Sequence, residues 1–92
     1  MKKVVFDFNH IPDLAAFYAD FARQFGIGDH FGANLDALWD EVTGSIELPV
    51  EIDFTNLNAA RKRKFGSLVL LFEEAEEELD GAFTFNLFPL RN

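Results

Sequence analysis

The chain has 92 residues, no cysteine and a formal net charge of −8, and 49% of its residues are hydrophobic, among them 12 phenylalanines. This apolar content can form the core of one small domain over residues 1–92 and excludes a disordered chain, while the lack of cysteine excludes disulfides, zinc–thiolate sites and a thiol nucleophile. The acidic balance repels nucleic acid and attracts a basic partner, although acidity also keeps a phenylalanine-rich domain soluble.

The first elements expected along the chain are a strand over residues 2–8 and a helix over residues 12–25. The strand sequence KKVVFDF is β-branched and aromatic, and its apolar run predicts burial on both faces. In the helix, Pro12 is expected at the first position, apolar residues recur at helical spacing, and Gly26 marks the end. Because Asp7 interrupts the first apolar run so early, we predict no signal peptide and a cytoplasmic protein.

A glycine-rich loop over residues 26–32 leads into a central helix over residues 34–44. Asn34 is a favourable N-cap, and Gly44 is expected to end the helix in a left-handed conformation. Apolar residues recur at i, i+3, i+4 and i+7, which predicts one inward-facing stripe. Its members are Leu35, Leu38, Trp39 and Val42.

Two aspartates share a different face of this central helix. Asp36 and Asp40 lie four residues apart, where like charges repel, and aspartate is a poor residue for a helix interior. A sequence selected only for helix stability would carry a lysine at one of the two positions. The pair therefore indicates a function that needs two exposed carboxylates.

The rest of the chain continues the alternation of strands and helices. The order strand, two helices, strand, two helices, strand predicts an α/β fold with a three-stranded parallel sheet and about four helices in two layers. Because three strands are few, helices are expected to cover mainly one face of the sheet. The expected boundaries are a strand over 49–54, a helix capped at Thr55–Asn56 and ending near 65–66, a helix capped by Ser67, a turn at Asp80–Gly81 and a strand over 82–88.

Other candidate sites in the sequence carry less information. We interpret His10 as a surface residue, while His30 lies in the glycine loop beside the acidic helix, and no metal-ligand spacing or cofactor motif accompanies either. The cations at 61–64 fall in the last turn of an expected helix, where they favour the helix dipole, so we interpret them as helix-end charges rather than a nucleic-acid patch. An enzyme built on Asp36, Asp40 and His30 is a distant hypothesis, since so small a chain has little room for an enclosing cleft.

The block GANLDALWDEVTG at residues 32–44 is long and specific, and it closely resembles the barstar family of intracellular ribonuclease inhibitors. The likeness extends from about residue 2 to residue 87. It implies a three-stranded parallel sheet packed by helices, with an acidic helix and its preceding loop plugging the basic active site of a ribonuclease. The partner-binding positions that it implies are His30, Phe31, Asn34, Leu35, Asp36, Trp39, Asp40, Thr43, Gly44 and Ser45, with Glu74 from the last helix.

Barstars carry tyrosine and tryptophan where this chain has His30 and Ser45, so the resemblance leaves the identity of the ribonuclease open. The leading hypothesis is a ribonuclease inhibitor without catalytic activity, monomeric when free. The second is an acidic interaction module that binds another basic protein without inhibiting a nuclease, and both need the same charged face. No membrane partner is expected, because the longest apolar run, residues 68–72, is too short to cross a bilayer.

Overall fold

A computed structural model of the chain describes residues 2–28 and 31–88, and it confirms the predicted α/β fold. Three strands form one parallel sheet in the order β1-β2-β3. Two helices separate each strand from the next, which gives the expected crossover pattern. The elements are β1 (Lys2–Asp7), α1 (Leu14–Phe25), α2 (Leu35–Gly44), β2 (Val50–Thr55), α3 (Ala59–Lys64), α4 (Gly66–Leu79) and β3 (Phe83–Phe88).

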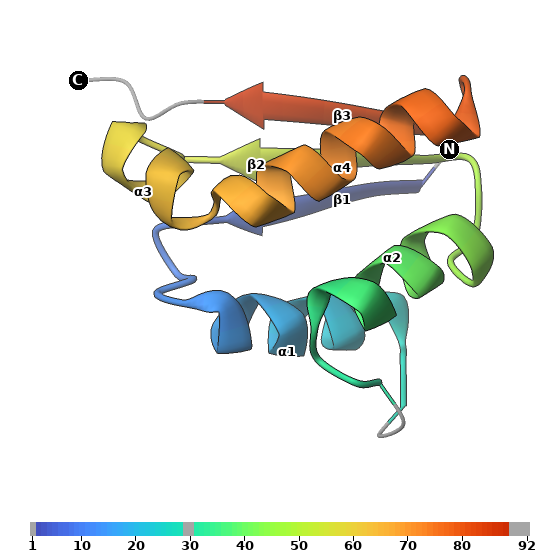
Figure 1. Cartoon of the computed structure of the whole chain (residues 1–92), viewed down its shortest axis with the longest axis horizontal. Helices are drawn as coiled ribbons and strands as arrows, with labels where there is room; N and C mark the ends of the chain where they lie inside the picture. Colours follow the sequence, from blue (N-terminus) through green and yellow to red (C-terminus); the bar gives the residue numbers. More distant parts are fainter. Residues whose placement is uncertain (1, 29–30, 89–92) are drawn as a thin grey trace.

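The helices lie on one side of the sheet, as expected. In Figure 1 the three strands point in the same direction, α4 crosses in front of them, and α1 runs beside β1 with α2 next to it. Among the helices of residues 2–28 and 31–88, none combines the length and hydrophobicity that a membrane-spanning helix requires. The placement of the helices on one side of the sheet leaves α2 and α4 packed against each other.

The prediction that the first strand is buried on both faces is wrong. Val4 and Phe6 are buried, whereas Lys3 and Val5 between them are exposed. The reason is that β1 has helices over one face only, so alternate side chains point to solvent.

An acid lies on the outer face of the sheet, in the central strand. Asp53 is only 3% exposed. Its carboxylate lies 3.4 Å from Nζ of Lys3 and accepts a hydrogen bond from Nδ2 of Asn86 at 2.9 Å. Both partners come from the strands on either side, so the three strands satisfy this acid without a ligand.

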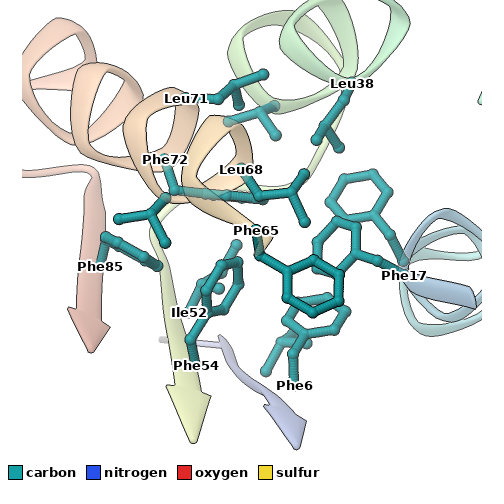
Figure 2. Packing of buried hydrophobic residues seen from close by; sticks show 14 of the residues in the cluster. Phe6, Phe17, Leu38, Ile52, Phe54, Phe65, Leu68, Leu71, Phe72 and Phe85 are labelled. Atoms are coloured by element: carbon teal, nitrogen blue, oxygen red, sulfur yellow. The ribbon is translucent and has the colours of Figure 1, made fainter. Parts of the chain in front are cut away.

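Phenylalanine rings fix the helices to the inner face of the sheet. The ring of Phe54 in β2 lies 4.9 Å from that of Phe85 in β3 and 5.1 Å from that of Phe72 in α4, both in edge-to-face geometry. The ring of Phe17 in α1 lies 4.8 Å from that of Phe6 in β1. Figure 2 shows these rings meeting in one cluster, which α2 joins through Leu38. Such contacts hold α1, α2 and α4 in fixed relative positions.

Three predicted helix starts are wrong, in each case because a neighbouring residue makes the start. Pro12 precedes α1, and Asp13 is its N-cap, with a carboxylate oxygen accepting from the amide of Ala16 at 2.8 Å. Asn58, rather than Thr55 or Asn56, caps α3. Ser67 lies inside α4, since the chain passes from α3 through Phe65 directly into Gly66 without a side-chain cap. The strands begin or end one residue from their predicted limits.

Side chains bond to backbone groups on both edge strands. Nε2 of Gln24 donates to the carbonyl of Val5 in β1 at 3.1 Å. A carboxylate oxygen of Glu76 accepts from the amide of Phe85 in β3 at 2.9 Å. Free backbone groups on a sheet edge can pair with another chain, so these two bonds agree with the expected monomer, which stays a prediction.

Candidate functional site

Asn34 fixes the start of α2, as the sequence predicts. Its φ of −144° is extended, and its side-chain oxygen accepts from the amide of Ala37 at 2.8 Å. Its side-chain nitrogen donates to the carbonyl of Gly32 at 3.2 Å. Asn34 therefore caps the helix and also ties the preceding loop to it.

The loop before α2 is tightly packed against the helix. A Cβ atom added to Gly32 would lie 3.2 Å from Cβ of Ala37 and 3.3 Å from Nδ2 of Asn34, so a side chain there would have to push these neighbours aside by a few tenths of an ångström. Ala33 follows with a φ of +50°, in the left-handed region that favours glycine. The entrance to α2 thus combines a close contact at Gly32 with a left-handed backbone at Ala33.

Phe31 anchors the loop to α1. Its ring lies 6.0 Å from that of Tyr18 and 5.9 Å from that of Phe21, and it is partly buried. As an expected partner contact it can present only part of its ring to another protein. His30, the other expected contact in this loop, lies outside the described residues, as does Asp29.

Asp36 and Asp40 are exposed on the outer face of α2. Neither carboxylate has a hydrogen bond or an ion pair within residues 2–28 and 31–88. This agrees with the expectation that they are not structural ion pairs within the chain. Two like charges one helical turn apart, with no compensating cation, attract cationic groups of another molecule.

The inward stripe of α2 is buried at its centre and open at its start. Leu38 and Val42 are fully buried in the core, as predicted, and Trp39 is partly buried against it. Leu35, however, is 36% exposed. It lies in the first turn, at the margin of the contact with α4, where another protein could cover it.

The C-terminal end of α2 differs from the prediction. Gly44 is the last helical residue and does not have a positive φ; the cap is Ser45, with φ −124° and ψ −34°. The amides of Ser45 and Ile46 both bond to the carbonyl of Glu41 at 3.0 Å, which ends the helix without a left-handed residue. A Cβ atom on Gly44 would meet nothing within 4 Å, so the fold itself does not require glycine there.

Thr43 and Ser45 complete this end of the helix. The Thr43 hydroxyl donates to the carbonyl of Trp39 at 2.7 Å, which leaves its oxygen lone pairs able to accept from another molecule. Ser45 is exposed. Both residues therefore lie where the sequence places them, at the end of the acidic helix.

Glu74 joins this face from α4. It is exposed, and it lines one groove of about 270 Å³ together with Asp36 and Trp39 of α2. Residues far apart in the chain thus place a third carboxylate beside the acidic face of α2. Hereafter we call Asp36, Asp40 and Glu74 the carboxylate triplet.

Sequence reasoning found Leu35 and Trp39 but missed the apolar residues that α4 contributes to the same groove. Leu70 of α4 is 57% exposed, and Leu71 lies beside it in the groove wall. The continuous apolar run 68–72 could have indicated that α4 exposes an apolar residue. Because a helix buries only one face in such a fold, one member of that run must point outward.

The remaining sequence candidates lie away from this face. His10 is exposed, with Nε2 3.7 Å from a carboxylate oxygen of Asp7. The pKa of Asp7 is lowered, chiefly by the hydrogen bond from Asn56 at 2.8 Å and also by the amide of Asn9. The cations of α3 occupy its last turn, as predicted. Within the described ranges, no group of His, Asp and Glu could hold a metal ion.

Two comparisons with known proteins bear on this face. The family model described as "Barstar (barnase inhibitor)" matches residues 1–88. The protein named "Putative ribonuclease inhibitor YrdF" from Bacillus subtilis (strain 168) is 29% identical over 86 residues. That alignment covers 90% of this chain and 94% of the relative, so the likeness spans both proteins almost completely.

Proposed function

The chain belongs to the barstar family, and from that premise we propose that it is a protein inhibitor of a basic, barnase-type ribonuclease, acting in the cytoplasm without catalytic activity of its own. The observation that carries the proposal is the carboxylate triplet, which is exposed and has no partner among the described residues. A structural role for these acids would require cations of the chain beside them.

The chemistry of the target explains the choice of carboxylates. An enzyme that cleaves RNA holds phosphates with Arg, Lys and His side chains, and carboxylate oxygens can take the places of phosphate oxygens. Arginine pairs with a carboxylate through two parallel hydrogen bonds, which adds direction to the charge attraction. Asp36, Asp40 and Glu74 would therefore occupy the phosphate sites and exclude RNA.

Rigidity of the acidic helix supports an inhibitory role. Asn34 caps α2 and holds the loop, Gly32 packs against Ala37, and Leu38 is buried in the core. The backbone of α2 that carries Asp36 and Asp40 is thus fixed before any partner arrives. A preorganised surface loses less conformational entropy on binding, which favours high affinity.

The neighbouring residues would complete the contact. Leu35, Trp39 and Phe31 offer partly exposed apolar surface around the carboxylates. Thr43, Gly44 and Ser45 lie at the end of α2, and Gly44 leaves open space in which a partner's backbone can approach. Asn34 would act by positioning the loop, and His30 would contact the partner from the same loop.

The proposal is tested by titrating this chain into barnase while RNA cleavage is measured. We expect inhibition that is complete at one inhibitor per enzyme. The double variant Asp36→Asn/Asp40→Asn should inhibit at least a hundredfold less, because charge pairs that are desolvated at the interface lose one partner.

The matched control is Glu73→Gln/Glu77→Gln. It removes the same number of charges at the same spacing from an exposed face of α4 outside the groove. This control should inhibit nearly as well as the parent chain, since it changes only the net charge. Absence of both binding and inhibition would contradict the proposal, and binding without inhibition would favour an acidic interaction module instead.

A further inference from the structure

An apolar groove lies within the acidic face, between α2 and α4. Leu35 and Trp39 line it from α2, and Leu70 and Leu71 line it from α4. Its exposed surface is mainly that of these apolar side chains. The volume of about 270 Å³ lies below the roughly 300–1,000 Å³ typical of small-molecule pockets, so the groove suits a single side chain of another protein.

Leu70 lies in this groove but is not part of the buried core. The buried residues of α4 are Leu68, Val69, Leu71, Phe72 and Ala75, whereas Leu70 is 57% exposed. A single exposed leucine is ordinary on a protein surface. Here, however, Leu70 shares a groove with Leu35, which is itself 36% exposed, and the two form a joint apolar surface.

The rim of the groove carries charge of one sign. Asp36 from α2 and Glu74 from α4 both line it, and no cation of the described chain does. An apolar surface flanked by two carboxylates is complementary to an apolar side chain that has basic neighbours. A second copy of this chain is a poor occupant, because it would bring further carboxylates to the same place.

We propose that this groove receives a large apolar side chain of the ribonuclease, adjacent to a basic residue at the rim of its active site, and that Leu70 is the residue that determines specificity for it. The inference rests on the proposed function but goes beyond the carboxylate contacts. The carboxylates attract and orient any basic site, whereas an apolar contact distinguishes one ribonuclease surface from another.

The two kinds of contact predict different kinetic signatures. Charge attraction acts at a distance and mainly sets the association rate, while a desolvated apolar contact forms after encounter and slows dissociation. Replacing Leu70 should therefore accelerate dissociation without changing the salt dependence of association.

The test measures binding of this chain to catalytically inactive barnase as the probe, by surface plasmon resonance at several salt concentrations. Leu70→Gln keeps a side chain of similar size and a similar helix preference but replaces the apolar end by a polar amide. We expect dissociation about tenfold faster or more, given the usual contribution of a buried leucine. Leu70→Met, which stays apolar, should dissociate at nearly the parent rate.

Two controls separate this inference from the proposed function. Val5→Thr replaces a methyl group by a hydroxyl on a side chain that is 44% exposed on the outer face of the sheet, and it should leave all rates unchanged. Asp40→Ala should weaken binding whether or not the groove is used. Tight binding by the parent with an unchanged dissociation rate for Leu70→Gln would overturn the inference and leave the function standing. Failure of the parent to bind would overturn both.

Discussion

Asp36 of α2 and Glu74 of α4 line the same groove, although they belong to different crossovers of the sheet. Neither carboxylate has a hydrogen bond or ion pair within the described ranges 2–28 and 31–88. Packing of α2 against α4 brings them together, and this packing depends on apolar residues such as Leu38 and Leu71 rather than on the acids themselves (Figure 2). The acidic face and the core can therefore be perturbed independently.

Asp40→Ala should reduce binding without reducing stability. Removing this exposed carboxylate relieves its repulsion with Asp36, so the free energy of unfolding should hold or rise by a few tenths of a kcal/mol. Binding to a basic ribonuclease should weaken by about 2–5 kcal/mol, because the partner's cation would be left buried and unpaired. Urea denaturation and titration calorimetry measure the two quantities. Unchanged affinity would contradict the role of Asp40.

Leu38→Ala should show the opposite pattern. Leu38 is fully buried where α2 meets the core. Truncation would leave a cavity and lower the free energy of unfolding by about 2–5 kcal/mol. The folded fraction should still bind, since the carboxylates lie on the other face of the helix. A large loss of affinity under conditions in which the variant is fully folded would show that the orientation of α2 depends on this one side chain.

Association with the ribonuclease should slow steeply as salt is added. Exposed charges are screened beyond roughly 8 Å at physiological ionic strength, and the carboxylate triplet is exposed. Stopped-flow fluorescence of Trp39 across a salt series gives the rates. The Asp36→Asn/Asp40→Asn variant should show a shallower salt dependence than the parent. An association rate independent of salt would exclude electrostatic steering by this face.

Gly44→Ala should stabilise the free protein and weaken the complex. Gly44 is helical with an ordinary φ, and an added Cβ would meet nothing within 4 Å. Alanine in a helix is favoured over glycine by about 0.5–1 kcal/mol, so the unfolding temperature should rise. If a partner's backbone approaches this position, the added methyl group should lower affinity. A gain in stability with unaltered affinity would show that the partner does not approach Gly44.

Asp7 should make the fold sensitive to acid. Its pKa is lowered from 3.8 in the folded state, chiefly by the hydrogen bond from Asn56. Stability from this group is therefore present above the unfolded value and is lost as pH falls through the lower folded pKa. Asp7→Asn should lower the unfolding free energy at pH 7 and converge with the parent in strong acid. Urea melts of both proteins at pH 7 and below pH 4 would show this, and equal losses at both pH values would contradict it.

Local features of the sequence determined the order of the elements and the acidic face of α2. The strands are short β-branched or aromatic runs, and Asn34 caps a helix whose apolar stripe and aspartate pair follow from helical spacing alone. The central block at residues 32–44 also indicates the family by its residues alone. These predictions succeed because each depends on residues within a few turns of the chain.

Tertiary structure decided where the helices begin and end, which side chains are exposed and which distant residues meet. Three helices start at residues near the predicted ones, and Gly44 is an ordinary helical residue rather than a left-handed cap. Several residues near each helix end could act as caps, and packing decides which of them does. Burial on only one face of β1 and the exposure of Leu70 depend on where α1 and α4 lie. The meeting of Glu74 with Asp36 depends on the packing of two helices from separate crossovers, which no spacing along the chain encodes.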